Sequence, residues 1–137
     1  MKRRLMTGAI VLAAGAAQGS VWEVSMERGL DTFTARAEGG RVTVVCDPDR
    51  VYNPRKPYGN IVVEMPHDRD AAQVVFLSKT GAQAAFDLTS GVAVQAESAE
   101  AWSGLIGMME QGGQIGVVTA EDSFILDMEP VRDLDCS

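Results

Sequence analysis

The sequence predicts a mainly β protein: a small antiparallel β-sandwich or partly open barrel of about eight short strands, with one α-helix at about residues 98–111. Short runs of alternating apolar and polar residues follow one another along the chain, and turn-forming residues separate them. Only one segment has the apolar spacing of a helix. Because the chain is short and has no internal repeat, we expect a single folded domain in it.

The first nineteen residues are typical of an export signal rather than of the fold. A basic head at residues 2–4 precedes an uncharged apolar stretch at residues 5–17, and small residues follow. A transmembrane helix takes about 20 apolar residues, so this stretch is too short to be a good anchor. Cleavage after Gly19 would leave residues 20–137, and cleavage after Ala16 is the alternative. We therefore expect a periplasmic or secreted protein with no stable membrane anchor after cleavage; an uncleaved N-terminal anchor remains the other interpretation.

The charge of the chain limits its partners. It has nineteen acidic and twelve basic residues, a net charge of −7, and three of the basic residues lie in the expected leader. Residues 20–137 then have nine basic residues against nineteen acidic ones, a net charge of −10. Nucleic acid and anionic lipid surfaces both require a basic face, so neither is an expected partner. Solubility is the simplest explanation of the charge.

Two cysteines, Cys46 and Cys136, are expected to form a disulfide. An exported chain meets an oxidising compartment, and two cysteines allow one intrachain pairing. Closing a loop of this length stabilises the folded state by about 4 to 5 kcal/mol in the loop-closure model. Two free thiols or an intermolecular bond are the alternatives. No C-x-x-C motif is present, so thiol–disulfide catalysis is not indicated.

The elements before the first long loop are three strands. They are expected at residues 21–26, with Trp22, Val24 and Met26 on one face, at residues 32–37, and at residues 41–46. Gly39 and Gly40 form the clearest hairpin, because glycine adopts positive φ without steric cost. Cys46 shares a face with Val42 and Val44 and is therefore expected to point inward.

The segment from 47 to 60 is expected to be a long exposed loop, because its three prolines exclude a regular central strand or helix. It is also the only locally basic and aromatic stretch of an acidic protein. Tyrosine and arginine often anchor interfaces, and long loops on small β domains often bind partners. A merely solvated loop is the alternative. The candidate binding residues are Arg50, Tyr52, Arg55, Lys56 and Tyr58.

The rest of the chain alternates strands and turns around one helix. Ser98 is the expected N-cap of this helix, and Glu100 lies in the first turn, where the helix dipole favours an acidic side chain. Gly112 and Gly113 are expected to end the helix. The helix presents an apolar stripe made of Ala101, Trp102, Leu105, Ile106, Met108 and Met109. The further strands are expected at 61–65, 73–78, 82–88, 92–96, 115–119 and 124–128.

Catalytic and metal-binding patterns are weak in this sequence. A single histidine, His67, lies in a polar turn, and no G-x-S-x-G motif is present. A zinc site made of His67, Glu64 and Asp68 would have few ligands, and the acidic segments lack the spacing of a calcium loop. We therefore predict no catalytic residue, no metal and no cofactor.

The order of the strands resembles a known family. The segments that carry the resemblance are, in order, Trp22-Glu23-Val24, Phe33-Thr34-Ala35-Arg36, Gly39-Gly40, Val42-Thr43-Val44-Val45-Cys46, Val75-Phe76, Phe86, a short helix, a glycine turn, Phe124-Ile125-Leu126 and Cys136. Their order is similar to the pattern of invasion-associated locus B-like small periplasmic β proteins. Members of that group usually carry more cysteines, and this chain departs from them there. The resemblance implies a non-enzymatic envelope protein, accessory to a surface or secretion assembly, and it carries over no functional residue.

These observations predict an exported, non-enzymatic binding or accessory protein of the cell envelope or of a secretion or surface assembly. Its expected partner is another envelope protein, and its oligomeric state is not predicted. One alternative is an envelope enzyme inhibitor resembling lysozyme or protease inhibitors, although the Ser-Gly-x-x-Tyr motif of one such family is absent. A small hydrolase that uses acidic residues is the other alternative.

Overall fold

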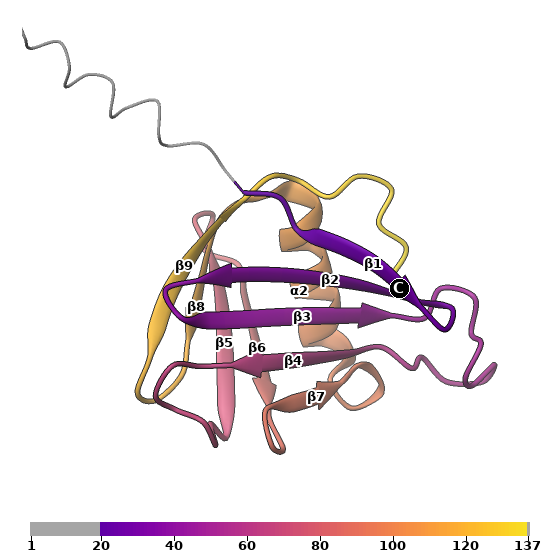
Figure 1. Cartoon of the computed structure of the whole chain (residues 1–137), viewed down its shortest axis with the longest axis horizontal. Coiled ribbons are helices and arrows are strands. Elements are labelled where there is room, and N and C mark those ends of the chain that lie inside the picture. Colours follow the sequence, from indigo (N-terminus) through magenta and orange to yellow (C-terminus); the bar gives the residue numbers. More distant parts are fainter. Residues whose placement is uncertain (1–19, 137) are drawn as a thin grey trace, which may run out of the picture.

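The mainly β class is confirmed by a computed structural model, which describes residues 20–136 (Figure 1). The expected leader, residues 1–19, lies outside this range, as does Ser137. The described chain forms nine strands, one α-helix and one short 3₁₀ helix. In order they are β1 (Glu23–Glu27), β2 (Leu30–Ala37), β3 (Gly40–Cys46), β4 (Asn60–Glu64), β5 (Gln73–Ser78), β6 (Gln83–Asp87), β7 (Val92–Val94), η2 (Gln95–Glu97), α2 (Ala99–Gln111), β8 (Gly113–Val118) and β9 (Ser123–Met128).

The strands form two antiparallel sheets, as the sequence predicts. The larger sheet has the order β1-β2-β3-β4-β7 and the smaller one the order β6-β5-β8-β9. Figure 1 shows the strands of one sheet crossing those of the other. Just before β1, Ser20 pairs with the edge of β9 in the smaller sheet, because its N–H donates to the Asp127 carbonyl (2.7 Å) and its carbonyl accepts from the Glu129 N–H (2.7 Å). Over the described residues the two sheets do not close into a barrel, which agrees with the expected sandwich or partly open barrel.

The core lies between the two sheets and is built by alternation along the strands. Val42, Val44 and Cys46 of β3 are all buried, which confirms the inward direction expected for the cysteine. From the smaller sheet, Phe76 and Phe86 meet edge to face with ring centroids 5.8 Å apart. Edge-to-face packing is a preferred geometry for aromatic pairs.

The hairpin between β2 and β3 is where the sequence places it, but its glycines have different roles. Glu38 (φ 50°) and Gly39 (φ 84°) adopt the left-handed conformation, whereas Gly40 does not. A Cβ atom on Gly40 would lie 2.2 Å from Cε2 of Phe124, so this position has no room for a side chain. Gly40 therefore allows β3 and β9 to approach closely, and Gly39 supplies the positive φ of the turn.

The helix α2 matches its expected range but not its expected cap. The Ser98 side chain makes no capping hydrogen bond, and only the Ser98 carbonyl takes part, accepting from the Trp102 N–H (2.8 Å). Gly112 (φ 71°) ends the helix as expected, and its N–H donates to the Met108 carbonyl (2.9 Å). The buried stripe consists of Trp102, Leu105, Ile106, Met108 and Met109, and the helix packs beside β6. None of the helices in the described range is long and apolar enough to cross a membrane.

The strand bounds match the expected ranges to within two residues, and two strands show a further difference in structure or burial. β7 ends at Val94 rather than at residue 96, because the next three residues form η2 and the Gln95 N–H donates to the Gly59 carbonyl (2.8 Å). In the first expected strand, Trp22 is 4% exposed, whereas Val24 is 63% exposed and Met26 is 73% exposed. Alternation therefore predicts the shared face of this strand but not its burial.

Candidate functional site

The loop between β3 and β4 has no helix or strand, as expected, and one buried carboxylate holds its first half. Asp47 is 6% exposed and accepts hydrogen bonds from the backbone N–H groups of Val51 (2.9 Å) and Tyr52 (3.1 Å). The Arg50 N–H donates to the Asp47 carbonyl (3.2 Å), and Arg50 itself has a positive φ of 52°. Hydrogen bonds to an ionised group are among the stronger ones in proteins, so this half of the loop has a defined shape.

The two tyrosines of the loop come together. The rings of Tyr52 and Tyr58 stack with centroids 4.9 Å apart and planes 19° apart, and the side chains are 44% and 45% exposed. The Tyr52 hydroxyl donates to the Arg28 carbonyl (3.2 Å) in the turn between β1 and β2. Half-exposed aromatic rings held in place offer a large contact area with little entropy left to lose on binding.

A groove of about 420 Å³ runs beside this tyrosine pair on the outer face of the larger sheet. Its walls come from the β1–β2 hairpin, from β3 and β4, and from the loop. The side chains lining it are Glu27, Arg28, Leu30, Thr32, Val45, Tyr52, Tyr58 and Asn60. The loop reaches the hairpin because Gly29 has no side chain, since a Cβ atom there would meet Cγ2 of Val51 at 3.2 Å.

The three basic residues of the predicted contact set do not line the groove. Arg55 and Lys56 are exposed in a turn held by Asn53, whose side-chain carbonyl accepts from the Arg55 N–H (3.0 Å) and whose backbone carbonyl accepts from the Lys56 N–H (3.3 Å). Arg50 is half-buried. The structure therefore joins Tyr52 with Tyr58 and leaves the cations around them on the loop.

The sequence missed the part of the groove that comes from other segments. The sequence patterns select no residue of the turn between β1 and β2, and they place Asn60 at the end of the loop, whereas it is the first residue of β4. No local pattern places Arg28 beside Tyr52, because the two residues are 24 positions apart in the chain. Gly29 was the single available clue, because a glycine in a short turn often allows a close approach.

The expected disulfide lies at the base of the loop. Cys46 and Cys136 are joined, with Cα atoms 5.1 Å apart and exposures of 1% and 3%. The Cys136 carbonyl also accepts a hydrogen bond from Nε1 of the buried Trp102 (2.6 Å). Since Cys46 directly precedes Asp47, the bond fixes the chain where the loop leaves the sheet.

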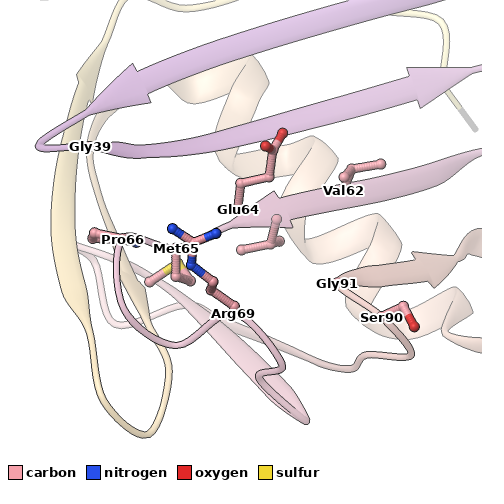
Figure 2. A pocket seen from close by; sticks show the side chains of 9 residues that line it. Gly39, Val62, Glu64, Met65, Pro66, Arg69, Ser90 and Gly91 are labelled. Atoms are coloured by element: carbon pink, nitrogen blue, oxygen red, sulfur yellow. The ribbon is translucent and has the colours of Figure 1, made fainter.

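A second cavity, of about 530 Å³, lies at the far end of β4, and no sequence pattern predicts it. β7 pairs with residues 60–62 of β4, and the Val63 N–H donates to the Gly91 carbonyl (2.8 Å), so β4 faces this cavity without a strand partner only at its last residue, Glu64. Figure 2 shows Arg69 reaching toward Met65, while Glu64 points away from it. Glu64 forms an ion pair with Arg41 of β3. The cavity therefore presents one guanidinium, that of Arg69, and a short strand edge.

The single histidine belongs to a contact between two turns. Asp122 accepts hydrogen bonds from the backbone N–H groups of His67 (2.9 Å) and Asp68 (2.7 Å), and its other oxygen lies 2.8 Å from Nδ1 of His67. In return, the Asp68 carboxylate accepts from the Glu121 N–H (3.3 Å). Burial raises the pKa of Asp122, but the hydrogen bonds from His67 and Asp68 outweigh it and lower the pKa below its ordinary value of 3.8.

This histidine has no serine, threonine or cysteine hydrogen-bonded to it in the described chain. The zinc ligands considered from the sequence are separately engaged, because Glu64 pairs with Arg41 and Asp68 binds a backbone N–H. From Ser20 to Cys136, no three histidine, cysteine, aspartate or glutamate side chains gather as a metal site.

No protein-family model matches this chain, and comparisons with curated proteins and with solved structures also find no significant match. The resemblance to invasion-associated locus B-like proteins stays a prediction. The loop with its tyrosine groove remains the candidate site on geometric grounds.

Proposed function

We propose that this protein is an exported, non-enzymatic binding or accessory protein of the cell envelope, and that it contacts another envelope protein through the loop between β3 and β4. The observation that carries this proposal is the stacked, half-exposed pair of Tyr52 and Tyr58 beside a groove. The carboxylate of Asp47 and the disulfide of Cys46 pre-form the loop. Pre-formed loops lose less entropy on binding, which favours recognition.

The charge around the loop supports a partner with acidic residues. Of the nine basic residues in positions 20–137, three belong to the loop and a fourth, Arg28, lines the groove. The other basic residues include Arg36 and Arg41, which already form ion pairs with glutamates of the same sheet. The loop is therefore a locally basic region on an acidic protein, and such a region guides an acidic surface toward it.

The contact surface can be tested by paired substitutions. Replacing Arg55 and Tyr58 with alanine should reduce recovery of the envelope partner at least about tenfold in a pull-down, since truncated interface anchors often cost 2 kcal/mol or more. The matched control replaces two exposed residues with alanine, Lys79 in the turn after β5 and Ile125 on β9. Thermal denaturation of both variants checks that the fold is intact. Unchanged recovery of every partner by the Arg55 and Tyr58 variant would make the loop proposal wrong.

The export part of the proposal has its own test. In a bacterial host, the protein should appear in the periplasmic or secreted fraction with the mass of residues 20–137. A protein found only in the cytosol with its full mass would contradict export without affecting the surface assignment.

An inhibitor of an envelope enzyme is the second candidate. The observation that favours it is the defined shape of the loop between β3 and β4, which the Asp47 carboxylate and the disulfide hold in place. Complexes of proteases with their inhibitors usually form with little backbone movement, which requires a loop of defined shape. A direct assay with lysozyme and with a serine protease distinguishes the two candidates. Inhibition that disappears in the Arg55 and Tyr58 variant would favour the inhibitor.

A further inference from the structure

β1 differs from every other strand that the structure describes. All five of its residues are exposed, whereas each of the other eight strands contains at least one buried residue. A strand with no buried residue gains little from packing within its own domain. Its position at the end of the larger sheet therefore requires another explanation.

The exposed residues of β1 include apolar ones on the face that should be covered. Val24 lies opposite Phe33, which lies opposite Val44, so the three side chains share the inner face of the sheet. Phe33 is 6% exposed and Val44 is fully buried, but Val24 is 63% exposed and Met26 is 73% exposed. Trp22, on the same side of the chain, is buried at 4%.

The backbone of β1 is also open. β1 pairs with β2 on one side, and over residues 20–136 no further backbone hydrogen bond reaches positions 23–27. Its outward edge therefore presents unpaired N–H and C=O groups, which form a template for another strand. Most proteins protect such an edge, and here it is combined with an uncovered apolar face.

The glutamates at the two ends of β1 decide against a second copy of the chain. In an antiparallel pair of β1 strands centred on Ser25, Glu23 of each copy would lie opposite Glu27 of the other. Like charges directly opposite one another destabilise a strand pair. Glu23 already forms an ion pair with Arg36, while no salt bridge of Glu27 is found in the described residues. A basic residue is therefore favoured opposite Glu27.

We propose that β1 binds an extended segment of a partner protein as an added antiparallel strand of the larger sheet. The segment carries apolar side chains opposite Val24 and Met26 and a lysine or arginine opposite Glu27. The main-chain hydrogen bonds supply affinity, and the apolar and charged positions supply the register. Glu27 also lines the groove beside the tyrosine pair, but the open edge and the apolar face of β1 belong to neither the loop nor the tyrosines. The proposal therefore goes beyond the proposed function and does not depend on it.

The test uses two capped peptides of opposite charge and NMR chemical shifts of the labelled full domain. The first is acetyl-Lys-Val-Thr-Val-Lys-amide, whose pattern complements β1, and the second has glutamate in place of both lysines. The lysine peptide should shift the amide resonances of residues 23–27 and slow their hydrogen exchange. The glutamate peptide should bind at least about tenfold more weakly, because its charges face Glu23 and Glu27.

Two matched variants locate the surface. Val24→Lys places a cation in the expected contact and should weaken binding of the lysine peptide at least about tenfold, whereas Ile125→Lys, at an exposed apolar position of β9, should leave it unchanged. Dispersed spectra of both variants show that they are folded. Equal binding of the two peptides, shifts that map away from β1, or no saturation with either peptide would overturn the proposal. So would a dimer of the unmodified protein in sedimentation that Val24→Lys dissociates, because the occupant would then be a second copy.

Discussion

Gly40 is the position where a single methyl group should have the clearest effect on stability. Its φ is not positive, so alanine meets no backbone strain, but the added Cβ would lie 2.2 Å from the Phe124 ring. Gly40→Ala should lower the free energy of unfolding by about 1 to 3 kcal/mol, the usual cost of an overpacked core. Urea denaturation followed by fluorescence measures the change.

Gly107 provides the matched control for that substitution. It lies inside α2, and an added Cβ would contact nothing within 4 Å. Gly107→Ala should stabilise the protein by about 1 kcal/mol, because alanine favours the helix over glycine. A loss of stability in both variants would show that the close approach to Phe124 is not the cause.

Asp122 should make the stability depend on pH in the acid range. Its pKa in the folded protein is below the ordinary value of 3.8, so its contribution is complete above that value and is lost as the pH falls through the folded pKa. Asp122→Asn should therefore lower the melting temperature at neutral pH, and the difference from the parent should shrink below pH 3.8. Asp127→Asn, at an exposed position of β9, is the control and should show no such convergence.

At the scale of elements, the loop between β3 and β4 depends on one carboxylate. Asp47→Ala removes the acceptor of the Val51 and Tyr52 N–H groups and should destabilise the protein by about 1 to 3 kcal/mol. Hydrogen exchange at these two amides should become faster. Asp49→Ala, two residues away and exposed, should change neither measurement. Similar exchange in both variants would mean that the loop is held in another way.

The elements themselves could be predicted because their patterns are local. Alternation places Val42, Val44 and Cys46 on one face, and Gly112 ends the helix where the apolar stripe stops, whereas Gly113 already begins β8. Ser98 occupies the predicted N-cap position, but the predicted side-chain hydrogen bond is wrong, because its side chain makes no capping bond. Residue type predicts where a helix begins more reliably than how its end is satisfied.

Burial of β1 and the walls of the groove could not be predicted, because both depend on segments far apart in the chain. Val24 alternates in the same way as Val42, yet one is exposed and the other buried. The difference lies in whether the second sheet extends over the strand, which no local pattern contains. In the same way, the loop residues could be selected by type, but Arg28 belongs to a distant turn and comes beside the loop only in the folded chain, where its carbonyl accepts a hydrogen bond from the Tyr52 hydroxyl.

At the scale of the whole molecule, the disulfide should be the strongest single stabilising feature. Replacing Cys46 and Cys136 with serine should lower the free energy of unfolding by about 2 to 5 kcal/mol, the usual loss for a native disulfide in a small domain. Urea denaturation of the oxidised parent and the double variant measures it. The parent treated with reductant should lose a similar amount, and intact mass shows whether the bond has opened. No change in either sample would mean that the bond contributes little to stability.

The separation of the two cysteines sets an order of events during biogenesis. Cys46 belongs to the third strand, but Cys136 follows the last one, ninety positions later. A chain that emerges from its N-terminus exposes Cys46 as a free thiol while six strands and the helix are still to come. Oxidation can complete this covalent link only after the entire sandwich has emerged. The thiol of Cys46 is therefore open to thiols of other molecules throughout emergence, and an efficient oxidant shortens only the time between the emergence of Cys136 and closure of the bond.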